Sequence, residues 1–281
     1  MNFTSAIEIL RRTPIPIDTW KEAQVGDNNN GPYKQNYPNI SVEENNSEPL
    51  IDVSIYGLAS SDFYMDRLLE GDQSLKPAFD NGLFWSRALL RNSHARRLAQ
   101  VDKYLRQNGL FLFIASGWRH PELQRIITTN FAKQYGEDEA RRMFAPVRGD
   151  KAPPPHSTGA AADLEIWSLD MGCRLEMYYT DNDINIYNAY LMERMSASRS
   201  PITLTERFST SLMNRRILFH VLCTQSVVFE NEQDLFCNHP GEFWHFGDGD
   251  PLSAYLSQEP IAPYGAIYPK RHNISLRLAL R

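Results

Sequence analysis

A histidine and an aspartate lie seven positions apart in the segment APPPHSTGAAADLEIW, residues 152–167. His156 follows three prolines, and Asp163 opens an apolar and acidic alternation that is typical of a strand. The prolines, together with Gly159, argue against a helix, so we expect a loop that leads into a strand. Imidazole and carboxylate groups both bind zinc, but a histidine beside a strand is more often a structural residue than a ligand. A metal site therefore needs a third ligand from elsewhere in the chain.

The segment HPGEFWHFGDGD, residues 239–250, could supply that ligand. With His245 the set becomes two histidines and one aspartate, and a catalytic zinc site uses three protein ligands and one water. Glu242 would then be the base that takes a proton from the water. The alternative is that the aromatic run around His245 is simply core, with the imidazole hydrogen-bonded inside it. Because residues three apart on a regular strand face opposite sides, Gly241 would have to bend the chain.

Four polar residues flank this pair: Cys237, His239, Asp248 and Asp250. The first two could bind a second metal, although a structural role is the simpler expectation. The two aspartates are expected to belong to a solvated turn.

Arg119 stands in the segment ASGWRHPELQ, between a short apolar run and a proline suited to the first turn of a helix. A cation at the end of a strand can be held rigidly beside a site. It could stabilise an oxyanion or bind a substrate carboxylate. The alternative is an ordinary surface salt bridge.

The expected elements follow from hydrophobic periodicity and from turn residues. Helices are predicted over 85–108, with Gly109 as the stop, from Pro121 onward, and over 205–222; strands are predicted over 110–115, 162–167 and 242–246. These helices and strands are interspersed without a regular alternation, which favours an α+β domain.

The chain has 281 residues, of which 42% are hydrophobic and 22% charged, and its net charge is -5. This is the composition of an ordinary soluble protein, and it gives no support for nucleic-acid binding. We expect a polar, Asn-rich N-terminal arm over residues 1–49 and one compact domain over 50–281. Three cysteines without a C-x-x-C pair, no recognisable signal segment and no long apolar run predict a cytoplasmic protein without a membrane partner.

Taken together, the motifs HSTGAAAD and EFWH resemble those of the zinc D-alanyl-D-alanine dipeptidases. This family is grouped with D,D-carboxypeptidases and cell-wall endopeptidases, and the hedgehog signalling domain shares its zinc fold. The resemblance spans about residues 50–270. It implies a single α+β domain with a central, mostly antiparallel sheet flanked by helices, and a zinc site on that sheet.

The resemblance also implies roles for individual residues. His156, Asp163 and His245 would bind one zinc ion per chain, Glu242 would be the general base, and Arg119 would stabilise the transition state. The expected substrate is a small dipeptide such as D-Ala-D-Ala.

Two positions depart from the family pattern: Pro154 stands where a serine is usual, and Phe243 where a tryptophan is usual. Substrate preference is therefore left open. One alternative is a carboxypeptidase or endopeptidase acting on peptidoglycan stem peptides, which uses the same catalytic set. Another is a zinc-stabilised binding domain without turnover, against which the presence of both Glu242 and Arg119 argues.

Overall fold

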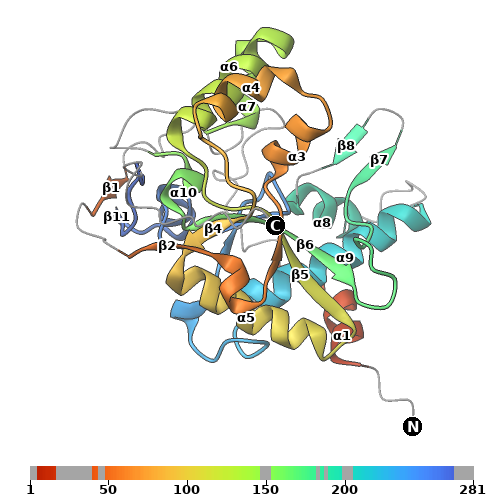
Figure 1. Cartoon of the computed structure of the whole chain (residues 1–281). Coiled ribbons are helices and arrows are strands. Elements are labelled where there is room, and N and C mark those ends of the chain that lie inside the picture. The colour runs from red at the N-terminus through yellow and green to blue at the C-terminus, as the bar shows by residue number, and fades with distance from the viewer. Residues whose placement is uncertain are drawn as a thin grey trace.

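A computed structural model describes residues 5–16, 40–43, 48–145, 153–181, 184–186, 189–197 and 205–268. Most of the expected Asn-rich arm lies outside these ranges. The organising element is a five-stranded sheet with strand order β3-β5-β6-β10-β9. Its strands are β3 (Ala59–Ser60), β5 (Leu110–Ser116), β6 (Ala161–Ser168), β10 (His245–Gly247) and β9 (Cys237–Asn238). The two long strands, β5 and β6, lie side by side in Figure 1.

The α+β class is confirmed, but the expectation of a mostly antiparallel sheet is corrected to a mixed one. β3 runs parallel to β5, whereas the pairs β5–β6, β6–β10 and β10–β9 are antiparallel. A parallel pair needs a long crossover. Here the crossover runs through α3 (Phe63–Leu69), α4 (Lys76–Asp80), β4 (Leu89–Arg91) and α5 (Asn92–Arg106).

One face of the sheet packs on the main core. Alternate residues of β5, including Leu112 and Ile114, are fully buried on this face, as are Leu164 and Ile166 of β6. The helices α5 and α9 (Glu206–Cys223) contribute to the same hydrophobic cluster. Burying each such side chain stabilises the fold by roughly 1.5–3 kcal/mol. Because strand side chains alternate, Asp163 and Glu165 must point to the other face.

A second, smaller core joins the helices that gather at the top of Figure 1. They are α3, α4, α6 (Pro121–Tyr135) and α7 (Glu137–Met143). Tyr64, Leu123 and Ile127 are buried in this cluster. Since Tyr64 and Gln124 also line a cavity beside Asp163, this helical group forms one wall of that cavity.

The remaining elements are short and mostly surround these two cores. They are α1 (Ala6–Arg12), β1 (Ser41–Val42), β2 (Leu50–Asp52), η4 (Val53–Tyr56), η5 (Gln73–Leu75), η6 (Pro155–Thr158), β7 (Tyr179–Asp181), β8 (Ile184–Ile186), α8 (Ala189–Ala197), η7 (Glu232–Asp234), α10 (Pro251–Ser257) and β11 (Ile261–Ala262). Helix α1 lies against α9 and buries Ile7 in the main core. None of the helices in the described ranges has the length and apolar character needed to cross a membrane.

Most of the predicted elements are confirmed, with two boundary errors. The helix expected over 85–108 begins only at Asn92, because residues 89–91 form β4 and pair with β2. Gly109 follows the end of that helix with a φ of 76°, as a stop residue should. The strand expected over 242–246 begins only at His245, because Glu242 lies in the turn before it.

Candidate metal centre and its cleft

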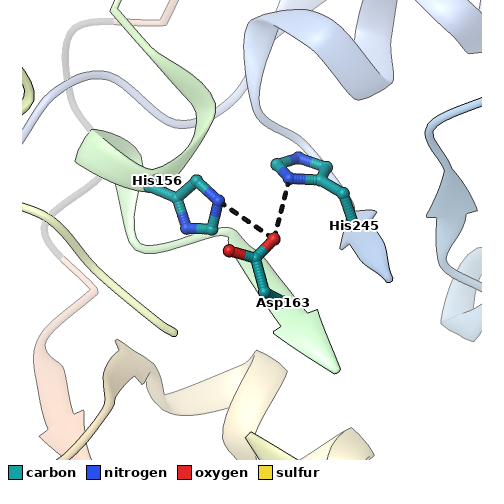
Figure 2. A group of neighbouring side chains, drawn as sticks. All are labelled: His156, Asp163 and His245. Atoms are coloured by element: carbon teal, nitrogen blue, oxygen red, sulfur yellow. Dashed lines mark ion pairs between the residues drawn. The ribbon is translucent and has the colours of Figure 1, made fainter. Parts of the chain in front are cut away.

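His156 is held in a rigid, buried turn. The preceding prolines lead into the short helix η6, and the residue is 7% exposed. Its Nδ1 lies 2.8 Å from the carbonyl oxygen of Gly117 and donates a hydrogen bond to it. A histidine that donates from Nδ1 keeps its Nε2 lone pair free for another partner. That Nε2 lies 3.4 Å from Oδ1 of Asp163 (Figure 2).

Asp163 and His245 are brought together by strand pairing. They are direct partners across β6 and β10, so their side chains leave the sheet on the same face. Nδ1 of His245 lies 3.3 Å from Oδ1 of Asp163 (Figure 2). The rings of His156 and His245 meet edge to face, with centroids 4.8 Å apart. The three side chains therefore converge on one point from a turn and two strands.

The donor set fits a divalent metal ion. One ligand atom from each of the three residues lies within 4.8 Å of the others. Within the described part of the chain, Oδ1 of Asp163 and Nδ1 of His245 are buried without a hydrogen-bond partner. Buried polar atoms are normally satisfied, so unpaired acceptors that face one another need an explanation, and a cation supplies one. Two imidazoles and a carboxylate match the ligand chemistry of zinc, although they do not identify the ion.

The charge balance of the cluster is consistent with an ionised aspartate. Burial alone would raise the pKa of Asp163, but His156 and His245 outweigh it and hold the pKa well below its usual range. Burial lowers the pKa of His156, which favours a neutral imidazole, whereas burial of His245 is outweighed by the interaction with Asp163, which raises the pKa of His245.

Glu242 lies beside the cluster, because a tight turn and not a strand carries it there. The amide of His245 donates to the carbonyl of Glu242 at 3.0 Å, which closes the turn. One carboxylate oxygen of Glu242 then lies 3.8 Å from Nδ1 of His245. The expected bend before the strand is therefore present. Burial raises the pKa of Glu242 to about 7, the range that suits a group exchanging protons near neutral pH.

Arg119 approaches Oδ2 of Asp163, the carboxylate oxygen that the two histidines do not face. Its Nη2 is 3.2 Å from Oγ of Ser116 and 3.9 Å from Oδ2 of Asp163. Its Nη1 donates to Oε1 of Gln124, and the guanidinium stacks 4.5 Å above the ring of Tyr64. An irregular register after Ile114 places Ser116 opposite Asp163. The residue is buried and directed at the cluster, so the surface salt-bridge alternative is wrong.

The cluster opens into a cavity of about 510 Å³. Six aromatic side chains are among the residues that line it, namely Phe63, Tyr64, Phe131, Phe144, Tyr178 and Trp244. Pro154, at the position where the resembled family has serine, also lines the cavity and has no hydrogen-bond donor to offer. Ligand sites of this size are usually largely apolar with a few fixed polar groups.

Sequence reasoning missed a polar group, Glu165 and Arg174, that also lines this cavity. Glu165 accepts hydrogen bonds from Arg174 at 2.9 Å, from the hydroxyl of Tyr178 at 3.2 Å and from the indole of Trp167 at 3.2 Å. The Arg174 guanidinium also stacks 4.5 Å above the ring of Tyr178. The signal was available for Glu165, since it lies two residues after Asp163 on one strand and shares its face.

The expectation of a solvated turn over Asp248 and Asp250 is wrong in part. It fails for Asp250, which is 1% exposed and caps helix α10. Asp248 does lie in a bend, with its side chain 39% exposed, and forms a 2.7 Å ion pair with the buried Arg97. Cys237 and His239 lie outside the three-residue cluster, so a second metal at these residues gains no support from the part of the chain that the structure describes.

An α+β sheet that presents two histidines, an aspartate and a neighbouring glutamic acid in one cleft is an arrangement typical of metal-dependent hydrolases. No family model matches the chain. A curated protein from Synechocystis, named D-alanyl-D-alanine dipeptidase, is 31% identical over 154 residues, which cover 52% of this chain and 57% of that protein. The chain thus spans little more than half the length of the relative. The comparison confirms the resemblance to the dipeptidase family that the motifs indicated.

Proposed function

We propose that the protein is a metal-dependent peptidase that hydrolyses short peptides, with a free dipeptide such as D-Ala-D-Ala as the first candidate substrate. Residues 50–281 would form the catalytic domain, with one zinc ion per chain held by His156, Asp163 and His245. The similarity to a protein named D-alanyl-D-alanine dipeptidase supports the choice of substrate class.

The observation that carries the proposal is the position of Glu242. Its carboxyl group lies within 3.8 Å of a candidate ligand, and burial raises its pKa to about 7. A site built only to hold a metal has no need of such a group, which argues for catalysis over a zinc-stabilised binding domain. Glu242 would accept a proton from the attacking water and return it to the leaving amine.

The other residues of the site would bind and orient the peptide. When bound, a zinc ion acts as a Lewis acid and makes water acidic enough to be a nucleophile near neutral pH. Arg119 would stabilise the negative charge that develops on the carbonyl oxygen, because its guanidinium is already fixed by Ser116 and Gln124. A preorganised donor of this kind needs no rearrangement during the reaction.

Arg174 would bind a carboxylate of the substrate. One of its N–H groups is used by Glu165, its stacking on Tyr178 fixes the plane of the guanidinium, and its side chain is 47% exposed at the cavity. Arg67 also lines the cavity and likewise pairs with a carboxylate, that of Asp72 at 2.6 Å, but among the described residues no aromatic ring stacks on its guanidinium to fix its plane. The planar guanidinium of Arg174 is suited to a carboxylate.

The size of the cavity favours a second candidate function, cleavage of longer stem peptides by carboxypeptidase or endopeptidase action. A space of about 510 Å³ lined by several aromatic side chains has more room than two alanine residues need. Hydrolysis of D-Ala-D-Ala, L-Ala-L-Ala and a stem pentapeptide by the zinc-loaded protein distinguishes the candidates. Turnover of the D,D-dipeptide alone supports the first candidate, and turnover of the pentapeptide alone supports the second. Cleavage of none of them would contradict the peptidase proposal.

A further inference from the structure

Asp250 caps helix α10 with only one of its two carboxylate oxygens, and the buried position of the other oxygen needs a separate explanation. Its Oδ1 accepts hydrogen bonds from the amides of Leu252 and Ser253, at 2.8 and 3.1 Å, and so caps helix α10. Its Oδ2 is buried and has no hydrogen-bond partner among the described residues. A buried carboxylate oxygen without a donor is costly, so its position calls for a further partner.

This oxygen lies against strand β10. A Cβ atom added to Gly247 would collide with Oδ2 of Asp250, so the oxygen occupies the place where a side chain at position 247 would stand. Residues 245 and 247 of a strand share one face. On the neighbouring strand, Asp163 pairs with His245, and Ala161 pairs with Gly247. Ala161 and Gly247 are small residues that pair across the strands beside Asp163 and His245, and they thus leave room for the Asp250 carboxylate.

His245 offers the missing donor. Its Nδ1 faces Asp163 and Glu242, which leaves Nε2 on the other edge of the ring. That Nε2 is buried and has no hydrogen-bond partner among the described residues. Asp250 and His245 also interact electrostatically with each other. Two unsatisfied buried atoms of opposite hydrogen-bonding character therefore lie on the same face of the strand.

We propose that Asp250 is a positioning residue for the metal centre: when a metal is bound, its Oδ2 accepts a hydrogen bond from the Nε2–H of His245, a bond that these two atoms do not form with each other in this structure. The bond fixes the tautomer in which the Nδ1 lone pair is directed at the metal, and it holds the ring plane. The carbonyl of Gly117 does the same for the opposite nitrogen of His156. Asp250 thus joins helix α10 to the ligand set. The inference rests on the proposed metal centre but not on any peptide being cleaved.

The test uses the full chain and Zn²⁺ alone, with metal affinity measured by competition against a chromogenic chelator. Asp250→Asn keeps the size of the side chain but replaces one carboxylate oxygen, a hydrogen-bond acceptor, by an amide NH₂ group, a donor. Asp250→Ser keeps a good helix cap but cannot reach the imidazole. Both variants should bind Zn²⁺ about 10–100-fold more weakly, and their Co²⁺ complexes should show a shifted visible absorption band. Asp52→Asn is the matched control, because Asp52 caps the short helix η4 and has no contact with the ligands.

Unchanged Zn²⁺ affinity in folded Asp250→Ser would overturn the inference, even if the variant melts at a lower temperature, because the role of Asp250 would then be capping alone. Equal losses of affinity in Asp250→Ser and in the Asp52→Asn control would overturn it as well. The proposed function is tested separately. A native protein that binds Zn²⁺ tightly but cleaves no peptide contradicts the peptidase proposal and leaves this test intact.

Discussion

Asp163 and His245 are direct cross-strand partners, and their side chains meet with 3.3 Å between Oδ1 and Nδ1. Strand pairing brings together two residues that are far apart in the sequence and fixes the face on which they lie. The third member of the cluster, His156, reaches the same carboxylate from a turn. The cluster therefore depends on the register of β6 and β10, and a slip by one residue would separate its members.

His156→Ala should lose the metal. The substitution removes one of three candidate ligands, while the turn around it is still held by Pro154, Pro155 and the hydrogen bond from Arg119 to the carbonyl of residue 156. We expect substoichiometric zinc after dialysis, measured by atomic absorption, with the far-ultraviolet circular dichroism of the native protein. His120→Ala is a control on a histidine outside the cluster. A His156→Ala protein that retains one zinc ion per chain would show that the ligand set is wrong.

Arg174→Met should raise KM for peptides with a free carboxylate and change kcat less. Charge-assisted hydrogen bonds contribute about 1.5–3 kcal/mol, and the half-exposed position of Arg174 reduces this, so we expect a rise of about tenfold. A peptide amide should be affected little, and Arg174→Lys should recover part of the loss. Arg67→Met is the matched control, because Arg67 lines the same cavity and also pairs with one carboxylate, that of Asp72, but is not the arginine that stacks on Tyr178. Equal KM values for native and Arg174→Met protein on both kinds of peptide would exclude carboxylate recognition here.

His94 should make the protein sensitive to acid. It is 1% exposed and donates from Nε2 to the carbonyl of Asp248 at 2.7 Å. Burial, together with the charges of Arg97 and Arg91, lowers its pKa to about 3. Between the ordinary value of about 6.5 and about 3, the unfolded chain binds a proton that the folded chain does not. The free energy of unfolding therefore decreases as the pH falls through this window, by up to about 1.4 kcal/mol per pH unit.

The check is urea denaturation of the native protein and His94→Gln at several pH values from 7 to 4. Glutamine keeps an N–H donor for the carbonyl of Asp248 but does not titrate. The variant should lose stability less steeply with falling pH, whatever its stability at neutral pH. Parallel curves for the two proteins would mean that His94 does not contribute to the acid sensitivity.

The sequence alone predicted the chemistry of the site better than its surroundings. His156 and Asp163 are local in the chain, and the prolines and small residues around them restrict the backbone, so a loop followed by a strand could be inferred. The bend at Glu242 was inferred from Gly241 alone, and the structure closes the turn with backbone hydrogen bonds. Local chemistry was sufficient in both cases.

The features that were missed depend on contacts between distant segments. Arg174 reaches the cavity only because Glu165 and Tyr178 hold it, and no periodicity in the sequence indicates that contact. Asp250 looked like a turn residue, since its burial depends on the small pair formed across two strands by Ala161 and Gly247. The parallel pairing of β3 with β5 is likewise set by the long connection between them, and the sequences of the two strands alone do not indicate it.

The most direct test of the account compares native protein with Glu242→Gln for zinc content and for D-Ala-D-Ala hydrolysis in the same preparation. Glutamine preserves shape but cannot exchange the proton, and general acid–base catalysis contributes about 10²–10⁴-fold. We predict full zinc content in both proteins and a loss of kcat of that order in the variant. Near-native turnover by Glu242→Gln would contradict the assignment of Glu242 as the base, and with it the central claim about this site.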